Sequence, residues 1–340
     1  MNFTGDSSFI YRTGVAFNTS QLNYSIQTNA KLYITRRTPV SSYRTLDVYG
    51  SIVCDTFKIT GNGTFNLHDY ASIYIASDSG INILGIKGNI TTRSRIFSSL
   101  ATYIYNGRNN QYTGNALPNI VYGLKLNLIS PTKKLVIKYN IQVTDSLDLQ
   151  SGVIESNNFL VTLGINTVNL GNLKQSNGYI NGSFARYLAP SINSGISGLF
   201  PIGISTDYRP IQLEFTTAPV TGGLVKGTYL SMDPGDAGLV ISDAGVDLLD
   251  ASSTGYWKME IVNGDFRNGV YKGIIYPNNY PDIKDPNIIH LISRSRGGSW
   301  TLDGTHKPST VTITNPIVSR NGMTKIADIG LSASNFTSLP

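Results

Sequence analysis

The chain has 340 residues, of which 40% are hydrophobic and only 14% are charged. Glycine is abundant, with 34 residues, and glutamate is rare, so the composition favours strands and tight turns and excludes a mainly helical protein. The formal net charge is +6, but the basic residues are scattered in twos and threes rather than gathered in one stripe, so we expect no nucleic-acid binding.

Cys54 is the only cysteine, which excludes an intrachain disulfide and a cysteine-based metal cluster. Its neighbours Ile52, Val53 and Phe57 are apolar, so we interpret it as a small buried hydrophobic residue. No apolar run approaches the roughly 20 residues that cross a bilayer, and the first residues lack the features of a signal peptide. We therefore expect no membrane span, and we expect the chain to be a processed form or a piece of a longer protein.

The first half of the chain consists of short alternating segments separated by turns. Residues 56–60 and 64–67 flank the turn Gly61-Asn62-Gly63, and residues 146–150 and 159–163 repeat the same arrangement. Alternation over three to six residues is typical of half-buried strands. The recurrence predicts an all-β fold that begins with a right-handed parallel β-solenoid over residues 1–185, with seven or eight stacked layers.

The pattern changes after residue 185. Residues 186–200 are rich in Gly, Ser and Pro and are interpreted as a linker or crossover. Residues 201–340 carry longer, more widely spaced strands, which predict an antiparallel β-sandwich with a loop-like tail at Ser338–Pro340. We expect Trp257 and Trp300 in its core. The predicted strands are Ile211–Phe215, Tyr256–Val262, Gly269–Ile275, Ile288–Ile292, Ser299–Leu302 and Val311–Ile313.

Several short phrases between Gly88 and Leu339 carry a resemblance to a known family. They include L-x-L-x-S-G at Leu147–Gly152, G-Y-I-x-G at Gly178–Gly182, F-P-I-G at Phe200–Gly203, W-T-x-D-G-T-H at Trp300–His306 and S-R-N-G-M-T at Ser319–Thr324. In this order they resemble a module of adhesin-like, β-solenoid-containing secreted surface proteins of Bacteroidota bacteria. The resemblance implies type IX secretion, an extracellular or outer-surface location, and a longer parent chain that ends in a C-terminal sorting domain. It implies no catalytic residue.

One cluster of tyrosines and amides is a candidate glycan-binding patch. Aromatic rings stack on sugars, and neighbouring amides bond to sugar hydroxyls. The alternative is that these tyrosines are ordinary half-buried strand residues. The candidate residues are Tyr103, Tyr105, Asn106, Asn110, Gln111 and Tyr112.

Asp233 and Asp236 lie in the densest acidic stretch and are candidate Ca²⁺ ligands. The stretch lacks the ligand register of an EF-hand, so a solvated loop is the alternative, and no other cofactor is expected. The three histidines are far apart in sequence and show no zinc-binding spacing. We expect His290 to be packed in a strand and His306 to bond to Asp303 in a turn.

These observations favour a non-catalytic structural or adhesive surface module that presents a rigid β-surface to matrix, glycan or other protein chains. One alternative is a carbohydrate-active β-helix enzyme, a polysaccharide lyase or hydrolase, which would need carboxylates converging in a groove of the solenoid. Another alternative is a trimeric fibre or stalk protein, which has the same Gly/Asn/Thr-rich composition.

Overall fold

The structure, a computed structural model of the chain, describes residues 2–3, 8–11, 22–277, 280, 286–308, 316–334 and 336. The described residues form strands throughout, with two short 3₁₀ helices, η1 (Gly195–Gly198) and η2 (Pro286–Ile288). The predicted all-β fold is therefore confirmed. Neither helix has the length and apolar character needed to span a membrane.

The chain folds into two compact units. The first holds Met1–Leu163 and Gly171–Tyr179, and the second holds Gly164–Leu170 and Ile180–Pro340. Strand β16 (Asn172–Leu188) contributes residues to both units, and β17 (Leu199–Phe200) follows it. The stretch expected to be a linker at 186–200 therefore lies outside strands only at residues 189–198.

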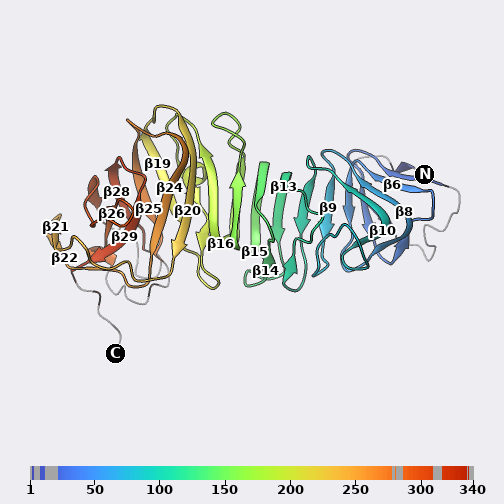
Figure 1. The fold of residues 1–340 in the computed structure, drawn as a ribbon, viewed down its shortest axis with the longest axis horizontal. Coiled ribbons are helices and arrows are strands. Elements are labelled where there is room, and N and C mark those ends of the chain that lie inside the picture. Colours follow the sequence, from blue (N-terminus) through green and yellow to red (C-terminus); the bar gives the residue numbers. More distant parts are fainter. Residues whose placement is uncertain are drawn as a thin grey trace. The chain divides into compact units, whose positions relative to one another are not determined.

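The first unit is a parallel β-solenoid of about eight turns, as the alternating segments predicted. Figure 1 shows its strands lying side by side in chain order. One sheet contains β1 (Asn2–Phe3), β3 (Tyr24–Ile26), β6 (Thr45–Val48), β8 (Ile59–Leu67) and β10 (Ile90–Phe97), with β5 (Thr38–Pro39) paired to β8. The other contains β2 (Ser8–Tyr11), β4 (Lys31–Ile34), β7 (Ser51–Val53), β9 (Ser72–Ile75), β11 (Thr102–Tyr105), β13 (Ile120–Asn127) and β15 (Ile141–Leu163), with β12 (Gln111–Tyr112) and β14 (Lys134–Val136) beside them.

The interior of the solenoid is a ladder of stacked side chains. Parallel pairing places one inward residue of each strand directly above that of the next, so apolar side chains from successive layers contact one another. All members of one such column are buried. The column consists of Leu32, Ile52, Ile73, Tyr103, Leu124 and Leu147.

The turns between strands are held by glycine and by buried amides. Gly61 bends β8 with a φ of +104°, and a Cβ there would lie 2.3 Å from the carbonyl oxygen of Val40, so only glycine fits. The fully buried Asn89 accepts from the amides of Ala76 and Ser77 and donates to two backbone carbonyls. Because an unpaired buried backbone group is costly, this side chain stabilises two neighbouring layers at once.

The second unit consists mainly of antiparallel strands, as expected for a β-sandwich. One of its sheets contains part of β16, β18 (Ile202–Gly203), β20 (Gly222–Leu230), β23 (Asp250–Ala251), β24 (Tyr256–Asp265), β26 (His290–Arg294) and β29 (Asp328–Ala333). The other contains β17, β19 (Ile211–Thr217), β25 (Val270–Ile275), β27 (Thr305–Lys307) and β28 (Val318–Met323). A separate hairpin consists of β21 (Ile241–Asp243) and β22 (Val246–Leu248).

Both tryptophans of this unit lie in its core, as predicted. Trp257 and Trp300 are almost fully buried, and their indole N–H groups donate to the carbonyls of Arg209 and Gly235. The segment Ser299–Leu302 is not a strand, since it forms only an isolated bridge at Thr301. The predicted strand Val311–Ile313 and the tail Ser338–Pro340 lie outside the described residues.

Candidate functional site

The structure contradicts the predicted glycan patch at its two central aromatic residues. Tyr103 and Tyr105 point into the solenoid and are 0% exposed, and their hydroxyls donate to the carbonyls of Ser98 and Thr113. Burial raises the pKa of both phenols. Rings inside the core cannot stack on a sugar, so the patch as predicted is wrong.

Gln111 is also buried and serves a turn rather than a ligand. Its side chain accepts from the amide of Gly107 and donates to the carbonyls of Ile75 and Ser77. Asn110 is exposed and accepts from the amide of Lys134, while the half-exposed ring of Tyr112 lies 4.8 Å from the Lys138 ammonium. Asn106 lines a groove of the solenoid, which the other five candidates do not line.

This groove, about 440 Å³ in volume, lies where strands of the solenoid's second sheet end. Because parallel strands end on the same side of a sheet, the residues that follow β4, β7, β11 and β13 are brought together there. The strands β4 and β13 are four layer spacings apart, so the groove extends for about 19 Å along the sheet. It is lined by Tyr33, Ile34, Thr35, Val53, Asp55, Phe57, Asn106, Arg108, Asn127 and Ile129.

The groove combines aromatic rings with amides. Tyr33 and Phe57 are partly exposed, and Asn127 is exposed at the far end. The Asn106 Oδ1 atom is buried and accepts no hydrogen bond from the described residues. A buried acceptor without a donor is costly, and a ligand hydroxyl would satisfy it.

The charges in the groove suit binding better than cleavage. Among the described lining residues, Asp55 is the one carboxylate and Arg108 the one cation. Hydrolysis of a glycosidic bond ordinarily requires two carboxyl groups on either side of the scissile bond. Other acids of the solenoid bond to neighbouring side chains; these pairs are Asp47 with His68, Asp69 with Ser98, Asp78 with Asn109, Asp148 with Lys125 and Glu155 with Lys134.

The predicted calcium ligands are not brought together into a cation site. Asp233 Oδ1 accepts from the amide of Gly235 at 2.8 Å, and Asp236 Oδ1 accepts from the amide of Ala251 at 2.7 Å. Both carboxylates are exposed, and each fixes the backbone of a different segment. A Ca²⁺ ion needs six or more converging oxygen ligands, and these two carboxylates do not supply them. The observed contacts therefore agree with the alternative, a solvated loop.

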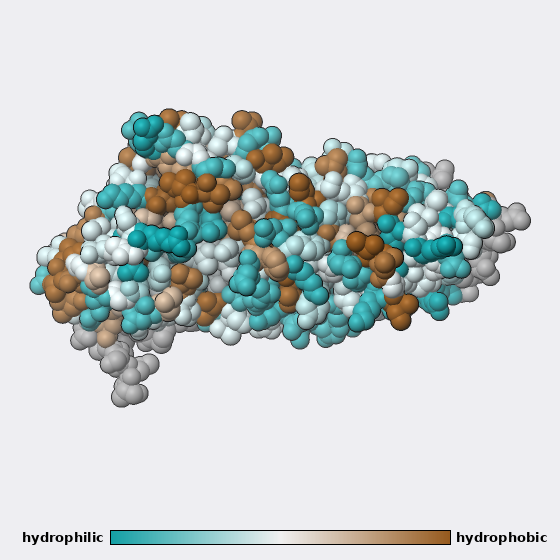
Figure 2. All heavy atoms as spheres, in the orientation of Figure 1, coloured by the Kyte–Doolittle hydropathy of each residue, from teal (hydrophilic) through white to brown (hydrophobic). Residues whose placement is uncertain are grey.

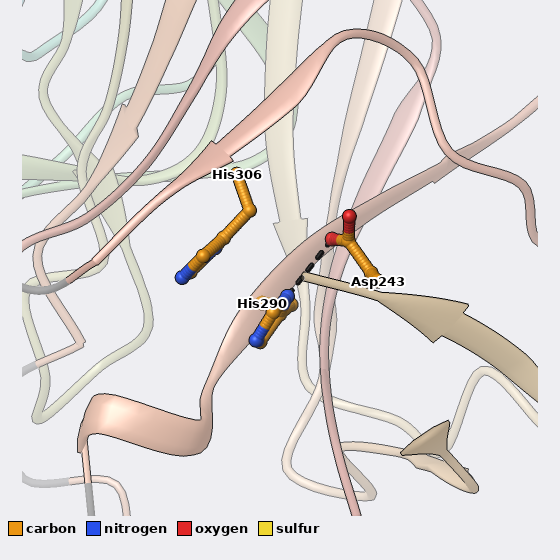
Figure 3. A group of neighbouring side chains, drawn as sticks. All are labelled: Asp243, His290 and His306. Carbon is orange, nitrogen blue, oxygen red and sulfur yellow. Dashed lines mark hydrogen bonds and ion pairs between the residues drawn. The ribbon is translucent and has the colours of Figure 1, made fainter. Parts of the chain in front are cut away.

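The second unit contains a cluster that sequence reasoning missed. Asp243 from β21, His290 from β26 and His306 from β27 lie together, with potential ligand atoms within 4.8 Å of one another (Figure 3). His290 Nδ1 lies 2.8 Å from Asp243 Oδ2, and the Arg320 guanidinium contacts the same carboxylate at 2.6 and 3.3 Å. His306 does not bond to Asp303 as expected, because the Asp303 carboxylate accepts from Thr324 and Lys325.

This cluster fits a structural clamp better than a metal centre. The rings of His290 and His306 are stacked, with centroids 3.6 Å apart and planes inclined by 13°. Nitrogen lone pairs lie in the ring planes, so nearly parallel rings cannot both point at one ion 2.0–2.1 Å away, the usual Zn–N distance. Arg320 already supplies a positive charge at Asp243, and it also donates to the carbonyls of Leu291, Asp303 and Gly304.

A groove of the second unit, about 550 Å³ in volume, is lined by the carboxylates Glu260, Asp265 and Asp328, of which Asp265 pairs with Arg267. Glu260 forms ion pairs with Lys226, Lys258 and Arg296 at 2.7, 3.1 and 3.5 Å. Asp328 faces Arg294 at 3.8 Å, and burial raises the pKa of its carboxyl. These contacts describe an ion-pair network across neighbouring strands.

Exposed apolar side chains are dispersed. Figure 2 shows small apolar patches separated by hydrophilic ones on the described part of the face it draws. The most exposed aliphatic side chains of the solenoid include Ile86 and Leu84, in the loop between β9 and β10.

In comparisons with known proteins, no family model, no curated protein and no solved structure matches the chain.

Proposed function

We propose that the chain is a non-catalytic adhesive module of a bacterial surface or secreted protein, and that the solenoid groove binds a neutral polysaccharide. The resemblance to secreted surface proteins of Bacteroidota bacteria supports an extracellular location and export by type IX secretion. The rigid stacked layers support a role in presenting a binding surface.

The observation that carries the proposal is the side chain of Asn106, which lines the groove with Tyr33 and Phe57 and whose buried Oδ1 atom accepts no hydrogen bond from the described residues. A sugar offers both matching parts, since its hydroxyls donate hydrogen bonds and its C–H faces pack on aromatic rings. Asp55 and Arg108 have opposite charges, so the groove as a whole favours an uncharged chain.

The experiment is a neutral-glycan array on the intact chain, followed by calorimetry with the best oligosaccharide. We expect Asn106→Ala to weaken binding about fivefold, because one hydrogen bond contributes about 1 kcal/mol. We expect Tyr33→Ala to weaken it by about tenfold or more, because a stacking surface is removed. The matched controls are Asn119→Ala and Tyr43→Ala, which change exposed residues outside the groove lining.

Equal binding by the groove variants and the wild-type chain would contradict the proposed site. A panel of hydrolase and lyase assays on the same polysaccharides tests the non-catalytic part. Turnover that Asp55→Asn abolishes would replace the adhesive function with an enzymatic one.

A further inference from the structure

The outer face of the β17-β19-β25-β28-β27 sheet carries a second hollow, about 770 Å³ in volume. The strand register places Gln212, Ile274, Ser319 and Lys307 in one row across four neighbouring strands. These four lining residues therefore lie on a rigid sheet rather than on loops, which favours a preformed binding surface.

Polar groups in this hollow have hydrogen-bonding capacity that the described residues leave unused. Asn321 Oδ1 is buried and accepts no hydrogen bond from them. Ser319, which is 7% exposed, lines the same hollow. Gln212, 6% exposed, is held in place because its amide donates to Glu214 and its Oε1 atom lies 3.5 Å from the Tyr276 hydroxyl. A buried acceptor and a buried hydroxyl side by side indicate a ligand that both donates and accepts hydrogen bonds.

The charges of the hollow are unbalanced toward the positive side. Lys272 and Lys307 line it, and neither forms an ion pair with a described residue. Glu214, the one carboxylate among the described lining residues, accepts from the amide of Gly195 at 2.9 Å and from Gln212. Two unpaired ammonium groups beside hydrogen-bonding amides favour a ligand that is both hydroxylated and anionic.

We propose that this hollow of the second unit, formed by Gln212, Lys272, Ser319, Lys307 and Asn321, is a binding site for an anionic oligosaccharide. Carboxylate or sulfate groups of the sugar contact the two lysines, and its hydroxyls bond to Ser319 and Asn321. This site uses none of the residues of the solenoid groove and does not depend on the function proposed for it.

The test is calorimetry of the intact chain with three oligosaccharides of similar length: a uronate polymer fragment, a sulfated fragment and a neutral one. We expect saturable binding of at least one anionic fragment that weakens with added salt, whereas any binding of the neutral fragment should not change when Lys272 and Lys307 are replaced. The double variant Lys272→Gln/Lys307→Gln should lower the affinity at least tenfold, and Asn321→Ala should lower it about three- to fivefold.

The controls separate this site from the solenoid groove and from general charge effects. Lys87→Gln and Lys138→Gln change two exposed lysines of the first unit and leave the affinity unchanged. Asn106→Ala also leaves anionic binding unchanged, whichever way the neutral-glycan experiment turns out. The proposal is overturned if no anionic fragment binds at low ionic strength, or if the double lysine variant binds as tightly as the wild-type chain.

Discussion

The imidazole rings of His290 and His306 stack face to face, with centroids 3.6 Å apart. His290 bonds to Asp243 on one side, and Arg320 holds the same carboxylate in a forked contact. Burial, and next the neighbouring His290, lower the pKa of His306 to about 4. The folded second unit therefore holds His306 in its neutral form.

This arrangement predicts that the second unit loses stability in mild acid. An unfolded histidine titrates near its ordinary pKa of 6.5, whereas folded His306 titrates near 4, so the unfolded chain binds more protons within this window. The free energy of unfolding of the second unit therefore keeps its full value above about pH 6.5 and falls as the pH drops toward about 4. The thermal midpoint reported by tryptophan fluorescence checks this, because Trp257 and Trp300 both lie in the second unit.

The variant His306→Phe keeps an aromatic ring against His290 but removes the titrating group. Its thermal midpoint should therefore depend less on pH across the same window. His68→Phe, a change in the first unit, serves as the control and should leave the dependence as in the wild-type chain. A wild-type midpoint that stays constant from neutral pH to about pH 4 would contradict the prediction.

Arg320 should be among the most sensitive residues of the second unit. Burial by itself would raise the pKa of the Asp243 carboxyl, but hydrogen bonds from Arg320 and His290 outweigh it and lower the pKa. Arg320→Met leaves this carboxylate without its main cation and should lower the free energy of unfolding by about 3–5 kcal/mol. Urea denaturation followed by tryptophan fluorescence measures the loss. Arg296→Met removes an exposed ion pair with Glu260 and should cost less than about 1 kcal/mol, so similar losses in the two variants would refute the buried clamp.

Asn89 should be a stability residue of the solenoid. Asn89→Ala removes four hydrogen bonds to backbone groups of neighbouring turns, and we expect a loss of about 2–4 kcal/mol. Asn89→Asp should also destabilise, because a carboxylate cannot donate to the carbonyls of Asp55 and Phe57. Circular dichroism during urea denaturation is the measurement, since the first unit has no tryptophan. Asn119→Ala, at an exposed position, is the control and should have little effect on the free energy of unfolding. If Asn89→Ala had an equally small effect, the four hydrogen bonds of Asn89 would not be needed for stability.

Tyr103 should affect folding and not glycan binding. Tyr103→Ala leaves a cavity in the inward ladder and should cost about 3–5 kcal/mol, whereas Tyr103→Phe loses one hydrogen bond and should cost about 1 kcal/mol. Tyr43→Ala, at a tyrosine that is 99% exposed, should have little effect on unfolding. If the Tyr103→Phe variant kept full stability but lost affinity for a glycan, the inward placement of the Tyr103 side chain would be contradicted.

The stack of parallel coils in the first half of the chain could be predicted from the amino-acid sequence. Alternation and glycine turns are local properties, and the segment Gly61–Gly63 carries both the turn and the steric requirement for glycine. The same local signals predicted that Cys54 is buried; burial raises the pKa of its thiol to about 12.

Which face of each strand points inward, and which distant residues lie together, could not be predicted and became clear from the folded chain. Residues 103–105 are all apolar or aromatic, so alternation placed Tyr103 and Tyr105 on one face without specifying that it was the interior. Asn106 and Tyr33 line one groove, and Asp243 lies beside His290 and His306, because strand register and intervening loop lengths fix these positions. No spacing in the sequence encodes such distances, since each depends on how many layers or strands lie between the two residues.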